Sequence, residues 1–346
     1  MSLTGQRINY VLGGPVQAEI EDRKISGEYP LSDFNAFVAG NDAKLVGTER
    51  ARSGSPTSLR RRMALAWQMS RQTRDYDVLV TSGEDIGFPL ALASLARRVR
   101  RPIWIVVHGS YLSSRKFALI APLIRRAGHV HFLCLSESLR RQMVDVHGFP
   151  PDRCHNAGYG VDTSFFRPAA SSDTPLVLSA GSANRDYQTL IAAVDGLDVP
   201  LRIAADSLWR PKAADLGTMQ LPANVDVGSA GGYTGLRTLY ERASFVVVPL
   251  HPARFACGYA VIAEAMAMGK AVVTTRTEAP SDFVVEGETG FYVEAGDVEA
   301  LRDRIRRLLD DTALARRMGQ AGAARMQDKF SLDDYCKTIE RVIRAA

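Results

Sequence analysis

One carboxylate stands alone in an apolar stretch of the C-terminal half of the chain. Glu264 lies in FACGYAVIAEAMAMGKAVVTT, a segment made almost entirely of hydrophobic residues and glycines. A carboxylate only accepts hydrogen bonds and can take two hydroxyl donors at once, so it suits a ligand with neighbouring hydroxyl groups. A carboxylate at the N-terminus of a helix also interacts favourably with the helix dipole, by about 0.5 kcal/mol. The segment alone leaves both interpretations open.

Other patterns with known chemistry have simpler structural explanations. The DYD at 75–77 matches a metal-binding motif, but it precedes an apolar run, whereas metal-binding acids face a ligand from the end of a strand. His129 and His131 have a spacing that a metal site tolerates, yet the pattern supplies no third ligand. Cys257 has no evident base beside it. No nucleophile elbow, phosphate-binding Walker loop or H-E-x-x-H motif occurs. We therefore predict no metal site.

The composition is that of a globular protein of about two domains. Hydrophobic residues make up 46% and charged residues 23% of the 346 positions, which are ordinary values. No apolar run approaches the roughly 20 residues that span a bilayer, and the N-terminus does not have the pattern of a signal peptide. Four widely separated cysteines argue against a disulfide framework or a structural zinc. Together these features predict a cytoplasmic location.

Short apolar runs alternate with segments of helical period through the N-terminal half. The runs lie at residues 8–14, 75–83, 101–110 and 129–136. They are continuously apolar, which is typical of strands covered on both faces of a parallel α/β sheet. Residues 15–74, between the first two runs, are polar and weakly periodic, and we predict irregular structure there.

A Pro-, Gly- and Ser-rich stretch near residues 158–172 interrupts this alternation, which then resumes. The sequence therefore predicts an α/β protein with two doubly wound, Rossmann-like domains, at 1–160 and 161–330. Ligands of such sheets bind beyond the carboxyl ends of the strands. We expect the ligand site in a cleft between the two domains.

Several segments in the same order resemble the retaining glycosyltransferases of family 4, also called group 1. GVDTSFFRP at 160–168 is similar to the family's G-V-D-x-x-x-F-x-P, which enters the second domain. LSAGSANRDYQTLIAA, LYERASFVVVPL, AEAMAMGKAVVTT and EGETGFYVEAGDVEAL continue the resemblance, which with VVHGS covers roughly residues 75–340. It implies the GT-B architecture of two facing Rossmann-like domains, with a C-terminal helix at 331–346 packed back onto the N-terminal domain. It also implies a nucleotide-sugar donor, a retaining mechanism and neither a metal nor a cofactor.

The resemblance assigns roles to two charged residues. Glu264 occupies the position of the family's second motif glutamate, which binds the two ribose hydroxyls of the donor nucleotide. Arg185 is the candidate for stabilising the departing diphosphate, because fixed cations must offset its charge where no metal does. The family has a second basic residue here, but this chain has Ser182 at that position. A solvated surface arginine is the alternative for Arg185.

The turn before Glu264 is the predicted diphosphate-binding turn. Gly258, Tyr259 and Ala260 lie where backbone N–H groups face the sugar and diphosphate of the donor in the family. Glycine permits close approach of the backbone, and a helix N-terminus supplies partial positive charge. A glycine that serves only a turn is the alternative.

Two loops of the N-terminal half complete the predicted site. His108 ends the run IWIVV and matches a family histidine that contacts the donor sugar, with Gly109 beside it. Gly13 and Gly14 end the first strand, where the family's loop touches the diphosphate and the acceptor side. A pair of glycines after a strand also makes a plain turn, and a histidine near a strand is commonly structural.

One position departs from the family pattern and leaves the function open. The family has a glutamate eight residues before the one matched by Glu264, but this chain has Ala256 there. The missing carboxylate binds hydroxyls of the donor sugar in the family. We predict metal-independent transfer of a sugar from a nucleotide sugar to a hydroxyl acceptor. A non-catalytic partner subunit and a nucleotide-sugar epimerase stay as alternatives.

Clusters of arginine give the chain a net charge of +5. Such a field favours phosphate-bearing ligands, nucleic acid or an anionic membrane, and no nucleic-acid-binding pattern accompanies it. Two arginine-rich segments, 58–70 and 113–128, carry apolar residues at helical spacing. These residues are Leu59, Met63, Ala66, Trp67, Phe117, Ile120 and Ile124. Two hypotheses follow: peripheral contact with the anionic inner face of a membrane, or helices packed on the first sheet.

Overall fold

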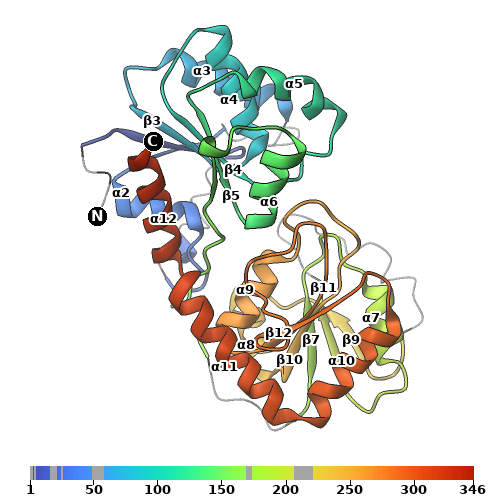
Figure 1. Cartoon of the computed structure of the whole chain (residues 1–346). Helices are drawn as coiled ribbons and strands as arrows, with labels where there is room; N and C mark the ends of the chain where they lie inside the picture. The colour runs from blue at the N-terminus through green and yellow to red at the C-terminus, as the bar shows by residue number, and fades with distance from the viewer. Residues whose placement is uncertain are drawn as a thin grey trace.

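The structure of the chain is a computed structural model that describes most of its residues. The described residues are 3, 5–15, 22–24, 26–48, 58–168, 174–205 and 221–346. They form two α/β units, one above the other in Figure 1. The predicted fold of two doubly wound domains is confirmed.

The N-terminal unit is built on six parallel strands in the order β2-β1-β3-β4-β5-β6. The strands are β1 (Ile8–Val11), β2 (Lys44–Val46), β3 (Val78–Thr81), β4 (Ile103–Val107), β5 (Val130–Cys134) and β6 (Cys154–Asn156). The helices are α2 (Asp33–Asn41), α3 (Leu59–Arg71), α4 (Glu84–Ala96), α5 (Arg115–Arg125) and α6 (Glu137–Arg141), with short turns η1 (Gln142–Val146) and η2 (Pro151–Arg153). Every residue of β1, β3 and β4 is buried, as the continuous apolar runs predict.

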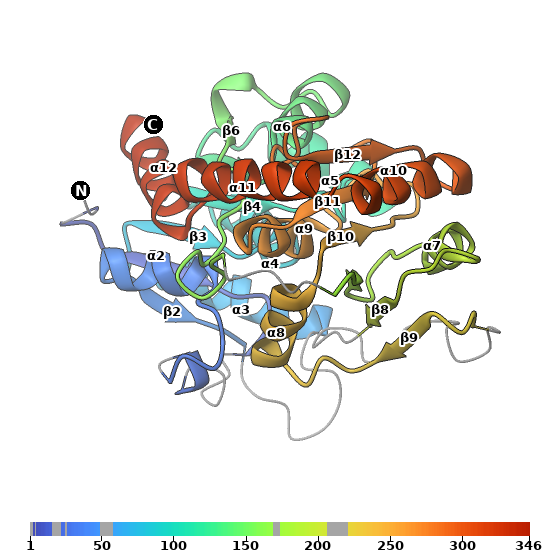
Figure 2. The same cartoon turned by 90° about the horizontal axis from the view of Figure 1, so that it is seen from below.

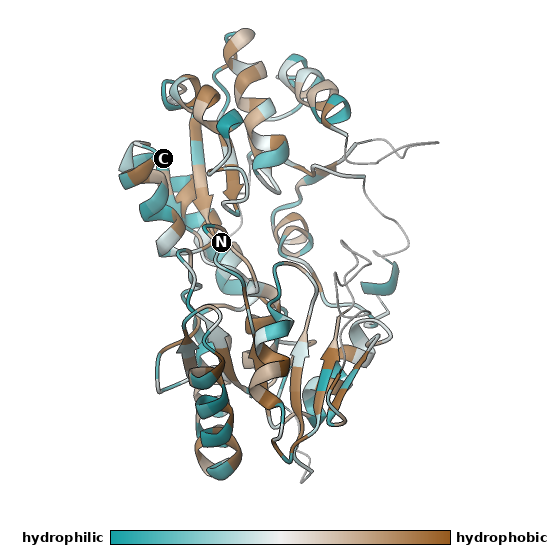
Figure 3. Cartoon of the chain, turned by 90° about the vertical axis from the view of Figure 1, so that its right-hand side faces the viewer, coloured by the Kyte–Doolittle hydropathy of each residue, from teal (hydrophilic) through white to brown (hydrophobic). Residues whose placement is uncertain are grey.

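The C-terminal unit repeats this design with the order β12-β11-β10-β7-β8-β9. Its strands are β7 (Val177–Ala180), β8 (Leu201–Ala204), β9 (Val225–Gly228), β10 (Phe245–Val248), β11 (Ala271–Thr275) and β12 (Gly290–Val293). Its helices are α7 (Tyr187–Val194), α8 (Tyr233–Arg242), α9 (Tyr259–Ala267), α10 (Val298–Asp310) and α11 (Thr312–Lys329). Hydrophobic residues dominate the strands of both sheets in Figure 3.

The last helix, α12 (Leu332–Ala345), lies against the N-terminal unit. Figure 2 shows α10, α11 and α12 following one another along one side of the molecule. The amide of Asn41 in α2 donates a hydrogen bond of 3.0 Å to the buried carboxylate of Glu340 in α12. The chain therefore crosses between the units twice, before β7 and again at α12.

Residues 15–74 contain more regular structure than the sequence predicts. The prediction of irregular structure is wrong for α2 and β2, whereas α3 lies where the segment 58–70 has helical spacing. Residues 16–21, 25 and 49–57 lie outside the described residues. The three-residue edge strand β2 is too short to show a period. The buried residues of α3 are Leu65, Ala66, Met69 and Ser70, and the arginines at 60–62 and 71 obscure this short face in the sequence.

No helix among the described residues is both long enough and apolar enough to span a bilayer. The longest of them, α11, is instead a packing element that lies against α9 and β11. Two of its glycines, Gly319 and Gly322, are buried at this contact.

The contact of α11 with the turn after α9 predicts opposite effects for its two glycines. A Cβ at Gly319 would lie 2.0 Å from the carbonyl oxygen of Gly269, whereas a Cβ at Gly322 would meet only Met266, at 3.5 Å. We expect Gly319→Ala to lower stability by about 1–3 kcal/mol through overpacking. Gly322→Ala should leave stability unchanged or raise it by up to about 1 kcal/mol, because alanine favours a helix. Differential scanning calorimetry of the two variants checks this, and equal melting temperatures would contradict it.

Candidate functional site

The predicted site residues lie at the carboxyl ends of strands in both sheets. In the N-terminal unit, residues 13–14 follow β1 and residues 108–109 follow β4. In the C-terminal unit, Arg185 follows β7 and residues 258–260 open α9. These ends are the ligand-binding edges of doubly wound sheets. Both sets of residues thus lie where doubly wound sheets bind ligands, and their contacts with a ligand stay predictions.

A direct hydrogen bond joins the two sets. The backbone N–H of Ala256 donates to the carbonyl oxygen of His108 over 2.7 Å. Gly109 has a left-handed φ of +87°, and a Cβ on it would lie 3.0 Å from the Cα of Phe255 and 2.7 Å from a methyl group of Leu139. The close approach of the two loops therefore requires glycine at position 109.

Glu264 is buried in the interior of α9, with 7% of its surface exposed. It is the sixth residue of this helix, so the helix-dipole interpretation of its charge is wrong. Within the described part of the chain, the one hydrogen bond to its carboxylate comes from the hydroxyl of Tyr240, 2.9 Å from Oε2. Burial raises the pKa of Glu264 to about 7, against the opposing effects of Tyr240 and of Arg185.

Arg185 is fixed at the carboxyl end of β7. Its Nε donates to the carbonyl of Ala180 over 2.9 Å and a terminal nitrogen donates to the carbonyl of Ala183 over 2.8 Å. Gly181 makes room for the guanidinium, since a Cβ there would lie 2.7 Å from the other terminal nitrogen. Burial lowers the pKa of Arg185, while nearby acidic groups that include Glu264 raise it. The alternative of a freely solvated arginine does not fit this placement.

The turn that opens α9 has separate backbone and side-chain contacts. Gly258 adopts a left-handed φ of +76°, and no side chain among the described residues caps this N-terminus. The amides of Tyr259 and Ala260 therefore lie in the uncapped first turn. The Tyr259 hydroxyl lies 2.9 Å from Oγ of Ser136 in the N-terminal unit and 2.9 Å from the carbonyl of Pro280. Only the backbone of Tyr259 is left for a ligand.

His108 is held by two neighbours that sequence patterns do not reveal. Its Nε2 lies 3.0 Å from the carbonyl oxygen of Ser82, which can only accept, so Nε2 carries a proton. The buried carboxylate of Glu84 accepts from the amide of Gly109 over 2.5 Å. Burial raises the pKa of Glu84, and His108 opposes this rise. Glu84 is a positioning residue whose only sequence signal is an acid in the first turn of a helix.

The two glycines after β1 differ in what they contribute. A Cβ at Gly13 would lie 2.2 Å from a carboxylate oxygen of Asp85, whereas Gly14 has open space around it. Nε of Arg62 lies 3.1 Å from that oxygen and donates to the carbonyl of Gly13 over 3.1 Å. A side chain at position 13 would therefore displace the Asp85 carboxylate from Arg62, whereas one at position 14 would meet nothing. Arg62 and Asp85 are charged neighbours of the predicted site that the sequence did not indicate.

The acidic and histidine patterns set aside as metal sites are structural. Asp77 forms ion pairs with Arg7 at 2.9 Å and Arg101 at 3.4 Å at the amino end of β3. The ring of His131 stacks on Trp104 with centroids 4.3 Å apart, and burial lowers the pKa of His131 to about 4. No group of three or more potential metal ligands occurs among the described residues.

Cys257 is a buried thiol rather than a nucleophile. Burial raises its pKa, and Nδ2 of Asn184 lies 3.6 Å from its sulfur. A raised pKa leaves little thiolate at neutral pH. Its burial favours the structural interpretation of Cys257.

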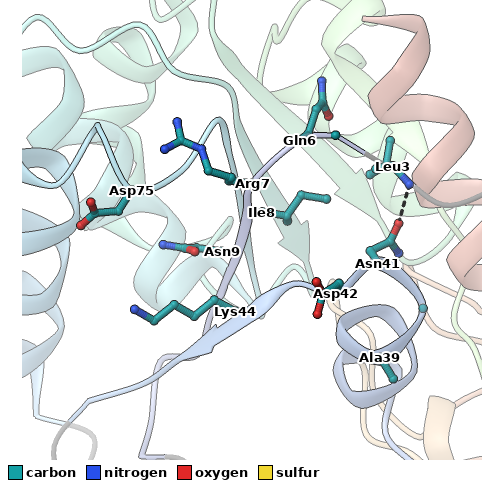
Figure 4. A pocket seen from close by; sticks show the side chains of 12 residues that line it. Leu3, Gln6, Arg7, Ile8, Asn9, Ala39, Asn41, Asp42, Lys44 and Asp75 are labelled. Atoms are coloured by element: carbon teal, nitrogen blue, oxygen red, sulfur yellow. Dashed lines mark hydrogen bonds between the residues drawn. The ribbon is translucent and has the colours of Figure 1, made fainter.

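A hollow of about 470 Å³ opens at the amino ends of strands in the N-terminal sheet, opposite the predicted site. Figure 4 shows Arg7, Asn9, Lys44 and Asp75 around it, near the amino ends of β1 and β2. Ligands of doubly wound sheets bind at the opposite, carboxyl ends. None of the predicted site residues lines this hollow.

Two protein-family models match the chain. Glycosyltransferase Family 4 matches residues 30–165 and Glycosyl transferases group 1 matches residues 161–325. Together the two models cover residues 30–325. The chain belongs to the glycosyltransferases that these models describe. Among solved structures it resembles sucrose-phosphate synthase from Thermosynechococcus elongatus, with a TM-score of 0.74 at 18% identity over 98% of this chain and 99% of that one. The Anabaena protein Alr3699/HepE in complex with UDP-glucose gives a TM-score of 0.69 at 16% identity over 98% and 100%. The predicted GT-B fold is confirmed.

Curated relatives match over parts of their length. The capsular polysaccharide biosynthesis glycosyltransferase CapM of Staphylococcus aureus is 37% identical over 103 residues, 30% of this chain and 26% of CapM. The lipopolysaccharide core biosynthesis glycosyltransferase LpsE of Rhizobium meliloti is 32% identical over 164 residues, 46% of this chain and 47% of LpsE. The chain thus spans between a quarter and a half of the length of these relatives.

Burial of the Glu264 carboxylate predicts a pH-dependent cost to stability. The pKa of Glu264 is about 7 in the folded protein and 4.5 ordinarily, so between these pH values the folded state binds more protons than the unfolded state. The contribution of Glu264 to stability therefore falls as pH rises through this window. At pH 8, Glu264→Gln should raise the free energy of unfolding by up to about 3 kcal/mol, and the gain should shrink towards pH 5. Urea unfolding at both pH values measures this. Glu288→Gln, at an exposed position in the turn before β12, is the control and should change stability far less. A gain that does not depend on pH would contradict the prediction.

Proposed function

We propose that this protein transfers a glycosyl group from a nucleoside diphosphate sugar to a hydroxyl acceptor, with retention at the anomeric carbon and without a metal ion. The observation that carries the proposal is the placement of two charged groups, Glu264 buried in α9 and Arg185 held by backbone carbonyls after β7. The two groups lie close enough to shift each other's pKa, beside the uncapped first turn of α9. A carboxylate for ribose hydroxyls next to a cation for phosphate matches the two halves of a nucleotide.

The charged groups divide the work of the reaction. Glu264 accepts hydrogen bonds from the two ribose hydroxyls, and this contact favours its ionised form. Arg185 and the amides of residues 258–260 stabilise the negative charge that develops on the diphosphate. Because these donors are fixed before the reaction, they require little reorganisation in the transition state. They supply the charge stabilisation that a metal ion provides in other glycosyltransferases.

The sugar and the acceptor meet on the N-terminal side. With Nε2 of His108 bound to the Ser82 carbonyl, Nδ1 is free of that bond and accepts from a hydroxyl of the donor sugar. The bond between the anomeric carbon and the phosphate oxygen breaks, and the acceptor oxygen bonds the same face of that carbon. The acceptor's proton passes to the departing phosphate oxygen. This route requires no separate protein nucleophile.

The alanine at position 256 supports one rival, a non-catalytic partner subunit. The family's glutamate at this position binds donor-sugar hydroxyls, and here the backbone of Ala256 is bonded to His108 instead. Relatives named as glycosyltransferases and the solved complex of Alr3699/HepE with UDP-glucose favour the enzyme. Thermal-shift screening with nucleotides and nucleotide sugars separates the two, because a ligand that binds only the folded state raises its melting temperature. Stabilisation by a donor with no release of nucleoside diphosphate, in the presence of candidate acceptors, would support the partner subunit.

Removing the cation at position 185 should reduce turnover without unfolding the protein. We expect Arg185→Met to lower kcat by about 100-fold or more, the usual cost of losing one fixed donor to a developing charge. Arg202→Met is the matched control, because Arg202 pairs with the exposed Asp226 near the far edge of the C-terminal sheet. Release of nucleoside diphosphate is the measurement. Equal losses in the two variants would contradict the role of Arg185.

Metal chelation should leave the reaction intact. If Arg185 and the amides of 258–260 carry the charge stabilisation, EDTA lowers the rate by no more than about two-fold. The assay compares enzyme dialysed against EDTA with enzyme supplied with Mg²⁺ or Mn²⁺. A loss of activity that either ion restores would refute the metal-free mechanism.

A further inference from the structure

Three helices of the N-terminal unit, α3, α4 and α5, form a layer on one side of its sheet. Contacts join α3 to α4 and α4 to α5, and Figure 1 shows the three together at the top of this unit, away from the C-terminal unit. The middle helix α4 is buried along most of its length. The outward faces of α3 and α5 therefore form much of the exposed surface of this layer.

Both outer helices expose large apolar side chains. On α3, Leu59, Met63 and Trp67 follow one another at four-residue intervals, and Leu59 is 61% and Trp67 46% exposed. On α5, Leu119 is 78% exposed and Leu123 lies one turn further along the same face. These five residues form what we call the α3–α5 apolar patch. Single exposed leucines are ordinary, but a row of exposed apolar side chains on each outer helix of one layer indicates a contact surface.

The exposed rows differ in part from those that the sequence indicates. Phe117 and Ile124 on α5 and Ala66 on α3 are buried and pack in the core, so the packing hypothesis is right for them. The outward face of α5 is carried by Leu119 and Leu123 instead. The exposed apolar residues of this surface are therefore identified by the structure and not by sequence periodicity.

The surroundings of this patch are strongly basic. No Asp or Glu occurs between residues 86 and 136, nor between residues 58 and 74. Eleven basic residues in these two ranges are exposed: Arg60, Arg71, Arg74, Arg97, Arg98, Arg100, Arg101, Arg115, Lys116, Arg125 and Arg126. A surface with this charge attracts an anionic partner of extended shape.

We propose that the α3–α5 apolar patch docks onto an anionic lipid bilayer. Arginine and lysine bind the headgroups, while Leu59, Met63, Trp67, Leu119 and Leu123 enter the boundary with the acyl chains. Trp67 suits this boundary because its amphipathic ring favours the membrane interface. A nucleic acid would satisfy the charge but would leave the leucines without a partner.

Docking on this face brings the predicted site close to lipid. Arg62 lies one turn into α3 and contacts both Gly13 and Asp85, at the carboxyl ends of the strands. The exposed Leu59 and Arg60 belong to the same first turn. A hydroxyl acceptor carried by a lipid would then be presented at the N-terminal side of the site. Docking itself does not depend on the proposed function, since it is measured without a donor.

Vesicle flotation of the full chain tests the proposal. Vesicles of phosphatidylcholine with phosphatidylglycerol should bind the protein, and vesicles of phosphatidylcholine alone should bind it at least ten-fold more weakly. Arg115→Glu with Arg126→Glu should weaken binding roughly 30-fold or more, and Leu119→Ser with Leu123→Ser roughly ten-fold. Arg306→Glu with Arg316→Glu changes the charge equally on exposed positions of the C-terminal unit and should bind as the unchanged protein does.

Three outcomes would overturn the proposal. They are the absence of binding to anionic vesicles, an equal loss in the Arg306 and Arg316 control, and binding to a single-stranded oligonucleotide in place of vesicles. A second measurement follows tryptophan emission on mixing with the anionic vesicles. A blue shift that Trp67→Phe abolishes supports insertion, and an unchanged shift in that variant contradicts it. Circular dichroism of each variant verifies folding.

Discussion

The contact between the two sheets is the constraint on which the site depends. Its centre is the hydrogen bond from the amide of Ala256 to the carbonyl of His108. Beside it, the carboxylate of Asp282 accepts from the amide of Glu137 over 3.0 Å, at the start of α6 in the other unit. The first bond joins two backbone groups, and the second joins a backbone amide to one side chain. The loops of the two units therefore meet in a defined register. Groups from both units can then act on one ligand.

Burial of Glu264 connects this arrangement to function. A buried carboxylate is costly to ionise, and its one hydrogen bond among the described residues, from Tyr240, offsets only part of that cost. Natural proteins retain such a group where a ligand completes its hydrogen bonding. The neighbouring guanidinium of Arg185 is itself partly buried and is held by backbone carbonyls. We propose that the two groups form a prearranged site and that a bound nucleotide completes the hydrogen bonding of Glu264.

Much of the fold follows from the sequence because its strands are continuous apolar runs. The runs at 101–110 and 129–136 predict buried parallel strands, and β4 and β5 lie there. The position of His108 at a strand end follows from the same pattern. The apolar residues of α5 are harder to interpret, because Phe117, Leu119 and Leu123 surround the helix and periodicity does not select the buried face. The short elements of residues 15–74 are similarly hidden by their polar composition.

The contacts that hold the site could not be predicted, because they join residues far apart in the chain. Glu84 fixes the amide of Gly109, and Asp85 binds Arg62, across 25 and 23 positions. Nothing in the local sequence distinguishes these acids from ordinary helix-start residues. The motif resemblance singles out Glu264 in the sequence. Its position in the interior of α9 follows from the start of that helix at Tyr259, which the sequence does not mark.

The most direct test is a crystal structure with the nucleoside diphosphate that gives the largest thermal stabilisation. Our account predicts both ribose hydroxyls within hydrogen-bond distance of the Glu264 carboxylate and the diphosphate between Arg185 and the first turn of α9. A nucleotide bound elsewhere, with Glu264 still bonded only to Tyr240, would contradict it.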